Sequence, residues 1–214
     1  MREYFSIMDP ILALTVKSTH FYLLDCKGGK LLLDAGWELG QFTAQLARYQ
    51  IPLKDIRYVM FTHTHPDHAG LIEDIRKLSG AKMIIHAAQI PFLADLEAFL
   101  ARKGGGTPIQ LMKGDLISPD RAALNAIGIR GEIFLTPGHS DDSISLCLDS
   151  GAAFTGDLAL PGFVTEEQAV LTCQSWKKLI DHGVKRFYPG HSDPFPLDRA
   201  RSMLEMNCDM DGAA

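Results

Sequence analysis

The segment Thr62-His63-Thr64-His65-Pro66-Asp67-His68 places three imidazoles and a carboxylate within seven residues, directly after an apolar, strand-like stretch. Alternate side chains of an extended backbone project to the same side, so His63, His65 and Asp67 can face one point while His68 turns toward a neighbouring one. Imidazole nitrogen and carboxylate oxygen together suit zinc, iron or manganese. The segment therefore predicts a metal site at the end of a strand, with ligands for two adjacent ions.

Three further candidate ligands follow apolar stretches in the second half of the chain. The tetrapeptide Pro-Gly-His-Ser occurs twice and contains His139 and His191, and Asp157 directly follows the stretch 152–156. Pro-Gly is a turn former that can end a strand and swing the next side chain over the edge of a sheet. Their matching placement predicts that His139, Asp157 and His191 join the first cluster.

The length, composition and net charge of the chain limit the kinds of protein that it can be. With 214 residues and 46% hydrophobic content, the chain can form one substantial core, and we expect a single domain over residues 1–214 because no long linker interrupts it. A formal charge of −5, without a Lys/Arg run, argues against nucleic acid or an anionic membrane as a partner. A small-molecule substrate fits this composition better.

The N-terminal region and the cysteines favour a cytoplasmic protein. The short apolar stretch Ile11–Val16 is too brief for a signal peptide or a membrane span. The four cysteines lie far apart and form no CxxC pair, which predicts buried, reduced thiols: Cys26, Cys147, Cys173 and Cys208.

Periodicity and turn residues predict alternating strands and helices. Two apolar runs flank Lys27-Gly28-Gly29-Lys30, which is typical of a β-hairpin. Further strands are expected at 56–61, 82–85, 133–136, 152–156 and 186–188, and helices at 37–49, 68–78, 88–102 and 197–206. Each candidate ligand thus lies just beyond a strand.

The order of these residues resembles the metallo-β-lactamase superfamily, whose pattern is HxHxDH followed by a distant His, an Asp and a last His. The residues that match it are His63, His65, Asp67, His68, His139, Asp157 and His191. The resemblance implies an α/β (α+β) fold of the αββα type, in which two mixed sheets pack face to face with helices outside and metals at one sheet edge.

The resemblance also implies roles for the seven residues. His63, His65 and His139 would hold one metal, Asp67, His68 and His191 a second, and Asp157 would bridge them. We expect two divalent ions, zinc first and iron or manganese as alternatives, with a metal-bridging hydroxide as nucleophile. Asp67 is the candidate catalytic residue, because its carboxylate can orient that nucleophile and pass a proton to the leaving group.

Three classes of function remain open. The expected function is hydrolysis of a small ester, lactone or thioester, with a phosphodiesterase on the same site as an alternative. An iron-dependent thiol or persulfide oxidoreductase is the redox alternative, and an idle metal-binding protein is a third. Redox members of the family with a diiron centre carry Glu where this chain has His65, and this favours hydrolysis.

The surroundings of the site are less defined by the sequence. Asp34 is either a partner of a ligating histidine or a turn residue that caps Ala35-Gly36. The segments 17–21, 102–116 and 158–164 are candidate walls of the substrate pocket, with Leu160, Phe163 and His86 as candidate pocket residues. An apolar patch of Phe92, Leu96 and Phe99 either pairs two subunits in a homodimer or packs on the sheet.

Overall fold

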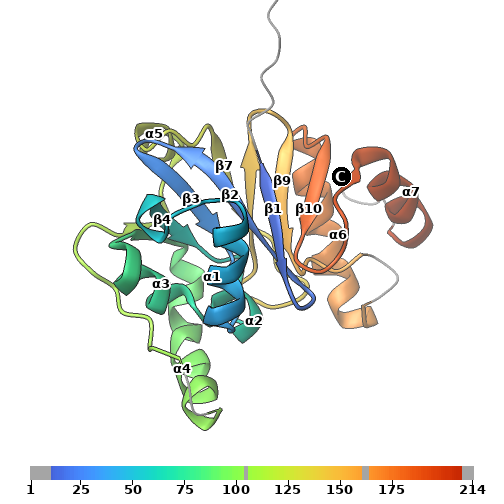
Figure 1. Ribbon diagram of the computed structural model, residues 1–214. Coiled ribbons are helices and arrows are strands. Elements are labelled where there is room, and N and C mark those ends of the chain that lie inside the picture. The colour runs from blue at the N-terminus through green and yellow to red at the C-terminus, as the bar shows by residue number, and fades with distance from the viewer. Residues whose placement is uncertain (1–10, 104–105, 161–163, 209–214) are drawn as a thin grey trace, which may run out of the picture.

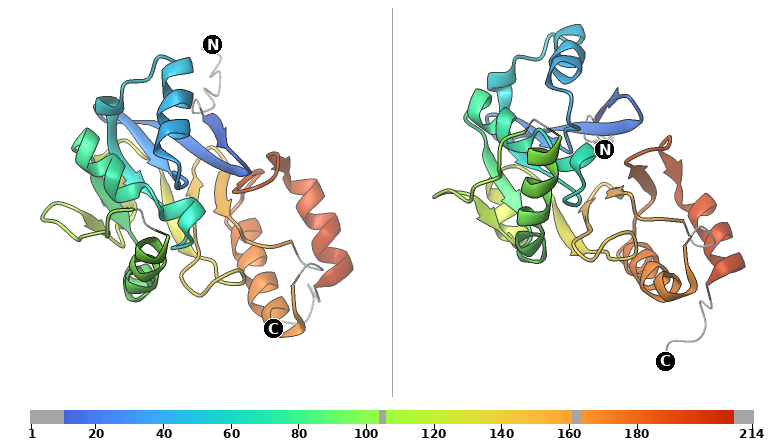
Figure 2. Two further views of the ribbon diagram at one scale, coloured as in Figure 1. Left: turned by 60° about the horizontal axis from the view of Figure 1, so that its bottom comes forward. Right: turned by 90° about the horizontal axis from the view of Figure 1, so that it is seen from below.

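The fold is an αββα sandwich, as Figures 1 and 2 show for the computed structural model, which describes residues 11–103, 106–160 and 164–208. The first sheet runs, in spatial order, through β1 (Leu12–Val16), β2 (Thr19–Cys26), β3 (Gly29–Leu33), β4 (Ile56–Met60), β5 (Lys82–Ile85) and β6 (Leu116–Ile117). The second runs through β11 (Phe195–Pro196), β10 (Arg186–Pro189), β9 (Ala152–Gly156), β8 (Ile144–Leu148) and β7 (Gly131–Leu135). Both sheets contain parallel and antiparallel pairs, so the expectation of two mixed sheets is confirmed.

Helices cover the outer faces of both sheets (Figure 2). The first half of the chain contains α1 (Leu39–Arg48), α2 (Pro66–Ala69), α3 (Ile72–Ser79) and α4 (Leu93–Arg102), with 3-10 turns η1 (Leu53–Asp55) and η2 (Ala87–Phe92). The second half contains α5 (Arg121–Ala126), α6 (Glu166–Asp181) and α7 (Leu197–Asn207). In the part of the chain that the structure describes, none of these helices is long and apolar enough to cross a membrane.

Strand alternation divides the core into three layers. In β2 and β3, Leu23 and Leu32 pack toward α1 and α3, whereas the residues next to them, such as Tyr22 and Leu31, pack between the two sheets. In β9, Ala153 packs toward α6 and α7, and Phe154 lies between the sheets. Because strands of both sheets are buried on both faces, their sequences read as nearly continuous apolar runs.

The two sheets are joined where the candidate ligands lie. The Tyr22 hydroxyl donates a hydrogen bond to the Pro189 carbonyl at 2.6 Å, and the His20 amide donates to the Gly190 carbonyl at 2.7 Å. The Ile144 amide donates to the Thr62 carbonyl at 2.8 Å. Two of these bonds tie β2 to the end of β10, and the third ties β8 to the end of β4, so ligands from different sheets can share one site.

Several expected elements are found, and others differ. The hairpin, the strand Lys82–Ile85 and the strand 152–156 lie where the sequence predicts them. The expected helix 68–78 is instead two helices, because the chain turns at Gly70-Leu71 between α2 and α3. The expected helix 88–102 begins as the 3-10 turn η2, which contains Pro91, and becomes α-helical only at Leu93.

The prediction of four reduced cysteines is wrong for two of them. Cys173 on α6 and Cys208 after α7 form a disulfide, with Cα atoms 5.9 Å apart despite a separation of 35 residues. The spacing along the chain could not reveal this pair, because the packing of α7 beside α6 brings it together. Cys26 and Cys147 are free thiols.

The disulfide predicts a thiol count and a stability difference. Denatured, unreduced protein should expose two thiols to a thiol reagent, from Cys26 and Cys147, and four after reduction. Because the bond closes a long loop, reduction should lower the free energy of unfolding by about 2–4 kcal/mol, measured by urea denaturation. The variant Cys208→Ser should show no effect of reductant. Four thiols in protein purified under air would contradict the pairing.

Candidate metal centre

All seven candidate ligands lie at the ends of strands along one edge of the sandwich. The loop after β4 and the short helix α2 provide His63, His65, Asp67 and His68, and the segments after β7, β9 and β10 provide His139, Asp157 and His191. Their ligand atoms form three overlapping sets, each within 4.8 Å: His63, His65 and His139; His63, His68 and Asp157; Asp67, His68 and His191. The structure therefore brings together every residue of the predicted ligand set.

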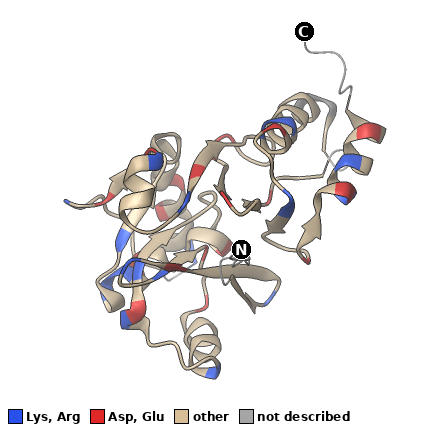
Figure 3. Ribbon diagram, turned by 90° about the horizontal axis from the view of Figure 1, so that it is seen from above, with Lys and Arg blue, Asp and Glu red and all other residues tan. Residues whose placement is uncertain are grey.

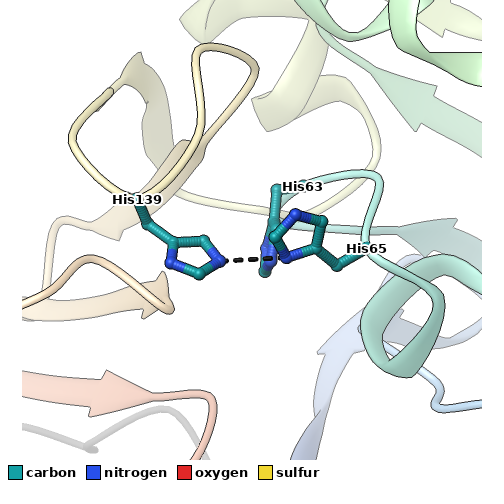
Figure 4. Close-up of side chains that lie close together, drawn as sticks. All are labelled: His63, His65 and His139. Carbon is teal, nitrogen blue, oxygen red and sulfur yellow. Dashed lines mark hydrogen bonds between the residues drawn. The ribbon is translucent and has the colours of Figure 1, made fainter. Parts of the chain in front are cut away.

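The first set contains three ring nitrogens aimed at one point (Figure 4). His65 Nδ1 and His139 Nε2 lie 3.0 Å apart. His63 is fully buried, and its Nε2 has no hydrogen-bond partner. A buried polar atom without a partner is costly, so this nitrogen fits a metal ligand.

The second set lies beside the first and includes the candidate catalytic carboxylate. His68 Nε2 is 3.3 Å from His191 Nε2, and Asp67 Oδ2 is 3.2 Å from His191 Nε2. The Asp67 side chain is 34% exposed, whereas His68 is fully buried. Asp67 is therefore open to solvent on one side while its Oδ2 faces the cluster.

Asp157 lies between the two sets. Its Oδ1 is 3.2 Å from His68 Nε2, and its Oδ2 is 3.2 Å from His191 Nε2 and 3.6 Å from His139 Nε2. Its Oδ2 is also 3.8 Å from His63 Nε2. One carboxylate thus faces ring nitrogens of both sets, which is the position a bridging ligand needs.

Hydrogen bonds on the outer side of the rings fix their orientation. His68 Nδ1 donates to Asp34 Oδ2 at 2.9 Å, and His191 Nδ1 donates to the Ser18 carbonyl at 2.8 Å. Asp34 also accepts from the Thr62 amide at 2.7 Å, so it holds the ligand loop as well as one ring. The sequence left Asp34 as either a partner of a ligating histidine or a turn residue, and these contacts favour the partner of a candidate ligand, His68.

The donor set fits metal ions. Neighbouring donors around a tetrahedral ion with bonds of roughly 2.1 Å lie about 3.4 Å apart. Neighbouring donor pairs such as His65–His139, His68–His191, His68–Asp157 and His63–Asp157 lie 3.0 to 3.8 Å apart, and all ligand atoms of each set lie within 4.8 Å of one another. Imidazole and carboxylate groups in this ratio suit zinc, iron or manganese better than calcium or magnesium.

The electrostatics of these side chains show how the carboxylates are balanced. Burial and the neighbouring His68 hold the pKa of His63 well below its ordinary value, so His63 is neutral. Hydrogen bonds to Asp157 and Asp67 raise the pKa of His191 to about 10. Burial opposes charge on His68, but Asp34 and Asp157 outweigh it and raise its pKa to about 10. A bound metal ion would displace the protons from these ring nitrogens, because histidine binds metal in its deprotonated form.

Asp142 is a supporting residue that the sequence did not reveal. Its buried carboxylate accepts from the Thr64 amide at 2.8 Å and from the Ser140 hydroxyl at 2.7 Å. It therefore links the loop of His63 and His65 to the loop of His139. The available signal is its place shortly after the first Pro-Gly-His-Ser, where a carboxylate can satisfy turn amides.

Gly190 lies too close to the cluster to carry a side chain. A Cβ atom there would clash with Asp157 Oδ1 and would lie 2.6 Å from His68 Cε1. We expect Gly190→Ala to displace both candidate ligands and lower metal affinity at least about tenfold, the size seen when supporting contacts of a metal site are lost. Metal content after dialysis against a weak chelator measures this. The control is Gly183→Ala. A Cβ atom at Gly183 would meet no other atom within 4 Å, so this variant should retain metal, although the left-handed backbone at this position makes alanine less favourable for folding. Unchanged metal affinity in Gly190→Ala would contradict the proximity.

An apolar cavity of about 330 Å³ opens beside the cluster. His139, Asp157 and His191 form one side, and its apolar wall consists of Leu158, Ala159, Leu160, Trp176, Pro189 and Phe195. Of the three candidate pocket residues, Leu160 lies in this wall, and Phe163 lies outside the described residues. His86 caps η2, where its Nδ1 accepts from the Ala88 amide, and the described residues that line this cavity do not include it. Sequence reasoning missed Trp176 and Phe195, which the packing of α6 and β11 brings to the cavity.

Together, the sandwich and the cluster at its edge define an αββα protein with a candidate metal site. The Metallo-beta-lactamase superfamily model matches residues 14–191, and the chain belongs to this superfamily. The chain is 29% identical over 171 residues to "Probable polyketide biosynthesis zinc-dependent hydrolase PksB" of Bacillus subtilis, covering 76% of this chain and 67% of that protein. It is 26% identical over 189 residues to "Thioesterase pkgB" of Emericella nidulans, covering 85% of this chain and 48% of that protein.

Solved structures share the fold. A metallo-beta-lactamase family protein from Thermus thermophilus superposes with a TM-score of 0.70 at 23% identity, covering 92% of this chain and 78% of that one. The chain spans about half to two thirds of the length of the curated relatives it matches.

Proposed function

We propose that the protein is a metal-dependent hydrolase that cleaves a small ester, thioester or lactone. The observation that carries this proposal is the apolar cavity of about 330 Å³, which shares His139, Asp157 and His191 with the cluster. An acyl group in this cavity places its carbonyl beside the candidate ligands. The relatives named as a zinc-dependent hydrolase and a thioesterase support the same class of reaction.

We assign the seven candidate ligands to two metal ions. His63, His65 and His139 would hold one divalent ion, Asp67, His68 and His191 a second, and Asp157 would lie between them. Two zinc ions are the proposed cofactor. When bound, such ions supply Lewis acidity and a water molecule whose pKa is lowered toward neutrality.

Asp67 is the proposed catalytic residue. Its Oδ2 lies among the candidate ligands, and the hydrogen bond with His191 keeps the pKa of this carboxyl low despite partial burial. As a carboxylate, it can accept a proton at Oδ2 from the attacking water and return it to the leaving oxygen or sulfur. Asp34 and Asp142 hold the rings and loops in place, which limits the reorganisation that the reaction requires. We propose a small-molecule substrate, without nucleic acid or membrane as a partner; the Cys173–Cys208 disulfide removes the support that four reduced cysteines would give to a cytoplasmic location.

A panel of substrates tests the reaction class. The panel contains p-nitrophenyl acetate, an acyl-homoserine lactone, S-lactoylglutathione, nitrocefin and bis-p-nitrophenyl phosphate. The proposal expects hydrolysis of at least one of the first three, lost on chelation and restored by zinc. Activity on the phosphodiester alone would overturn it in favour of a phosphodiesterase, and metal-dependent oxygen consumption with a thiol would favour the oxidoreductase.

The cavity predicts a limit on acyl length. Leu160→Trp should fill part of the apolar wall and lower kcat/KM for hexanoyl or longer p-nitrophenyl esters by about tenfold, the size of a small packing conflict. The rate with p-nitrophenyl acetate should stay within about twofold, because an acetyl group does not reach this wall. Leu171→Trp, on the exposed face of α6, is the control. Equal losses for acetate and hexanoate esters would contradict this use of the cavity.

A further inference from the structure

An aromatic pair, of an exposed Trp37 and a half-buried Phe99, lies beside Asp67. Trp37 follows β3, Phe99 belongs to α4, and their rings stack with centroids 6.0 Å apart and planes inclined by 19°. Trp37 is 43% exposed despite this contact. Both rings line a cavity of about 250 Å³, together with Asp67 and Pro66. The candidate catalytic carboxylate thus has an open aromatic surface next to it.

This surface extends past the cluster into a second cavity. That cavity, of about 310 Å³, is lined by His65, Phe99 and Pro66, so Phe99 and Pro66 belong to both. The apolar cavity of the proposed acyl site is lined by different members of the cluster, namely His139, Asp157 and His191. The cluster therefore has one cavity system on the side of Asp67 and another on the side of Asp157.

The side of Asp67 suits the leaving group. An acid that protonates the leaving oxygen or sulfur must lie within hydrogen-bond reach of that atom. Asp67 lines the cavity with Trp37 and Phe99, whereas the described residues around the acyl cavity do not include it. With the acyl group on the side of Asp157, the leaving group extends over the aromatic pair.

Charged side chains of both signs surround the pair. The Lys17 ammonium lies 5.7 Å from the centre of the Trp37 ring, but it is paired with Glu38 at 2.7 Å. The Lys103 ammonium lies 5.8 Å from the centre of the Phe99 ring. The second cavity is lined by one cationic residue, Arg102, and by one acidic residue, Asp95. Figure 3 shows both signs of charge dispersed over the fold. The aromatic faces of Trp37 and Phe99 favour a planar ring in the substrate, which they bind through stacking and burial.

We propose that Trp37 and Phe99 form a leaving-group subsite that selects esters or thioesters whose leaving group carries a planar aromatic ring. This inference rests on the proposed hydrolysis and names its substrate class. Trp37 and Phe99 act as specificity residues, because they contact the substrate away from the bond that breaks. The contact exists before and during the reaction, so its loss raises KM more than it lowers kcat.

A matched pair of substrates tests the subsite. S-benzyl and S-cyclohexylmethyl thioacetate share the acyl group and a primary thiol leaving group. They differ in the planarity of the ring and in thiol acidity, so the contribution of stacking is the part of the preference that wild type shows beyond Trp37→Leu. Wild-type protein should favour the benzyl compound in kcat/KM by roughly three- to tenfold, the range expected for one stacking contact. Trp37→Leu should remove this part of the preference through KM and leave S-ethyl thioacetate within about twofold. Trp37→Phe should restore most of the preference, and Tyr49→Leu, an exposed aromatic residue just after α1, should not change it.

The outcomes separate the subsite from the reaction. Hydrolysis without a benzyl preference, or with a preference that is unchanged in Trp37→Leu, would overturn the subsite and leave the proposed function standing. No hydrolysis of any thioacetate or of any ester, thioester or lactone of the panel would overturn the function, and a binding measurement then tests the subsite. The chain has two tryptophans, of which Trp176 is buried. Saturable quenching of fluorescence by 4-nitrobenzyl alcohol, lost in Trp37→Leu, supports the subsite, and quenching unchanged in that variant overturns it.

Discussion

Replacing Asp157 with alanine is expected to lower hydrolysis by about a thousandfold or more and to reduce the metal content from two ions to one. The two carboxylate oxygens face ring nitrogens of both candidate ligand sets at 3.2 to 3.8 Å. Losing the shared ligand removes several kcal/mol of charge stabilisation. A loss of about 4 kcal/mol corresponds to a thousandfold in rate. Elemental analysis and kcat/KM of the same preparation measure both effects.

A matched carboxylate separates this effect from general damage. Asp193 lies in the exposed loop after β10, two residues beyond His191, and Asp193→Ala should retain both ions and activity. Circular dichroism checks that Asp157→Ala is folded, and Asp157→Asn, which keeps the shape, provides a second variant. Two ions per chain and a rate within tenfold of wild type in both variants would contradict the bridging position.

Replacing Asp67 with asparagine is expected to lower kcat by about a hundred- to ten-thousandfold, the contribution of a positioned acid–base group. The amide keeps the shape of the side chain but cannot accept and return a proton at this position. Affinity for the first ion should change little, because the three histidines of that set do not include Asp67. The assay compares kcat at saturating zinc with the affinity of the tighter metal site.

The affinity for the second metal ion provides an internal control for this experiment. Asp67 is also a candidate ligand of the second set, so the weaker metal affinity should fall in Asp67→Asn. Raising the zinc concentration then restores occupancy but not the rate. A rate that recovers fully at high zinc would show that Asp67 acts only as a ligand, and an unchanged rate at low zinc would remove it from the site. Asp193→Asn serves as the control.

The candidate ligands were predictable from the sequence because they follow apolar strands in a fixed order. Motifs such as Pro-Gly-His-Ser place a histidine just past a strand end, and the structure brings both of these histidines to the same sheet edge. The hydrogen bonds that hold the candidate ligands in place were harder to predict from the sequence. Asp142 and the Ser18 carbonyl act through loops whose positions depend on the pairing of β7 with β8 and on the turn between β1 and β2.

Some elements of the fold were not predicted from the sequence. The strand β8 is buried at all five residues and lacks an alternating pattern, so periodicity does not identify it. The helix α6 was also missed, although Thr165 caps its start by accepting from the Gln168 amide. Together with β11, this helix brings Trp176 and Phe195 to the acyl cavity, and only tertiary packing sets that arrangement. The disulfide between α6 and the residue after α7 was hidden for the same reason.

A zinc titration of chelator-stripped protein tests the central claim most directly. The rate of ester or thioester hydrolysis is measured after each addition of zinc, with the protein concentration well above the dissociation constants. The proposed dinuclear hydrolase predicts negligible activity without metal and a rate that rises until two equivalents per chain are bound. Full activity in the stripped protein, or a plateau at one equivalent, would contradict a reaction that depends on both sets of residues around Asp157.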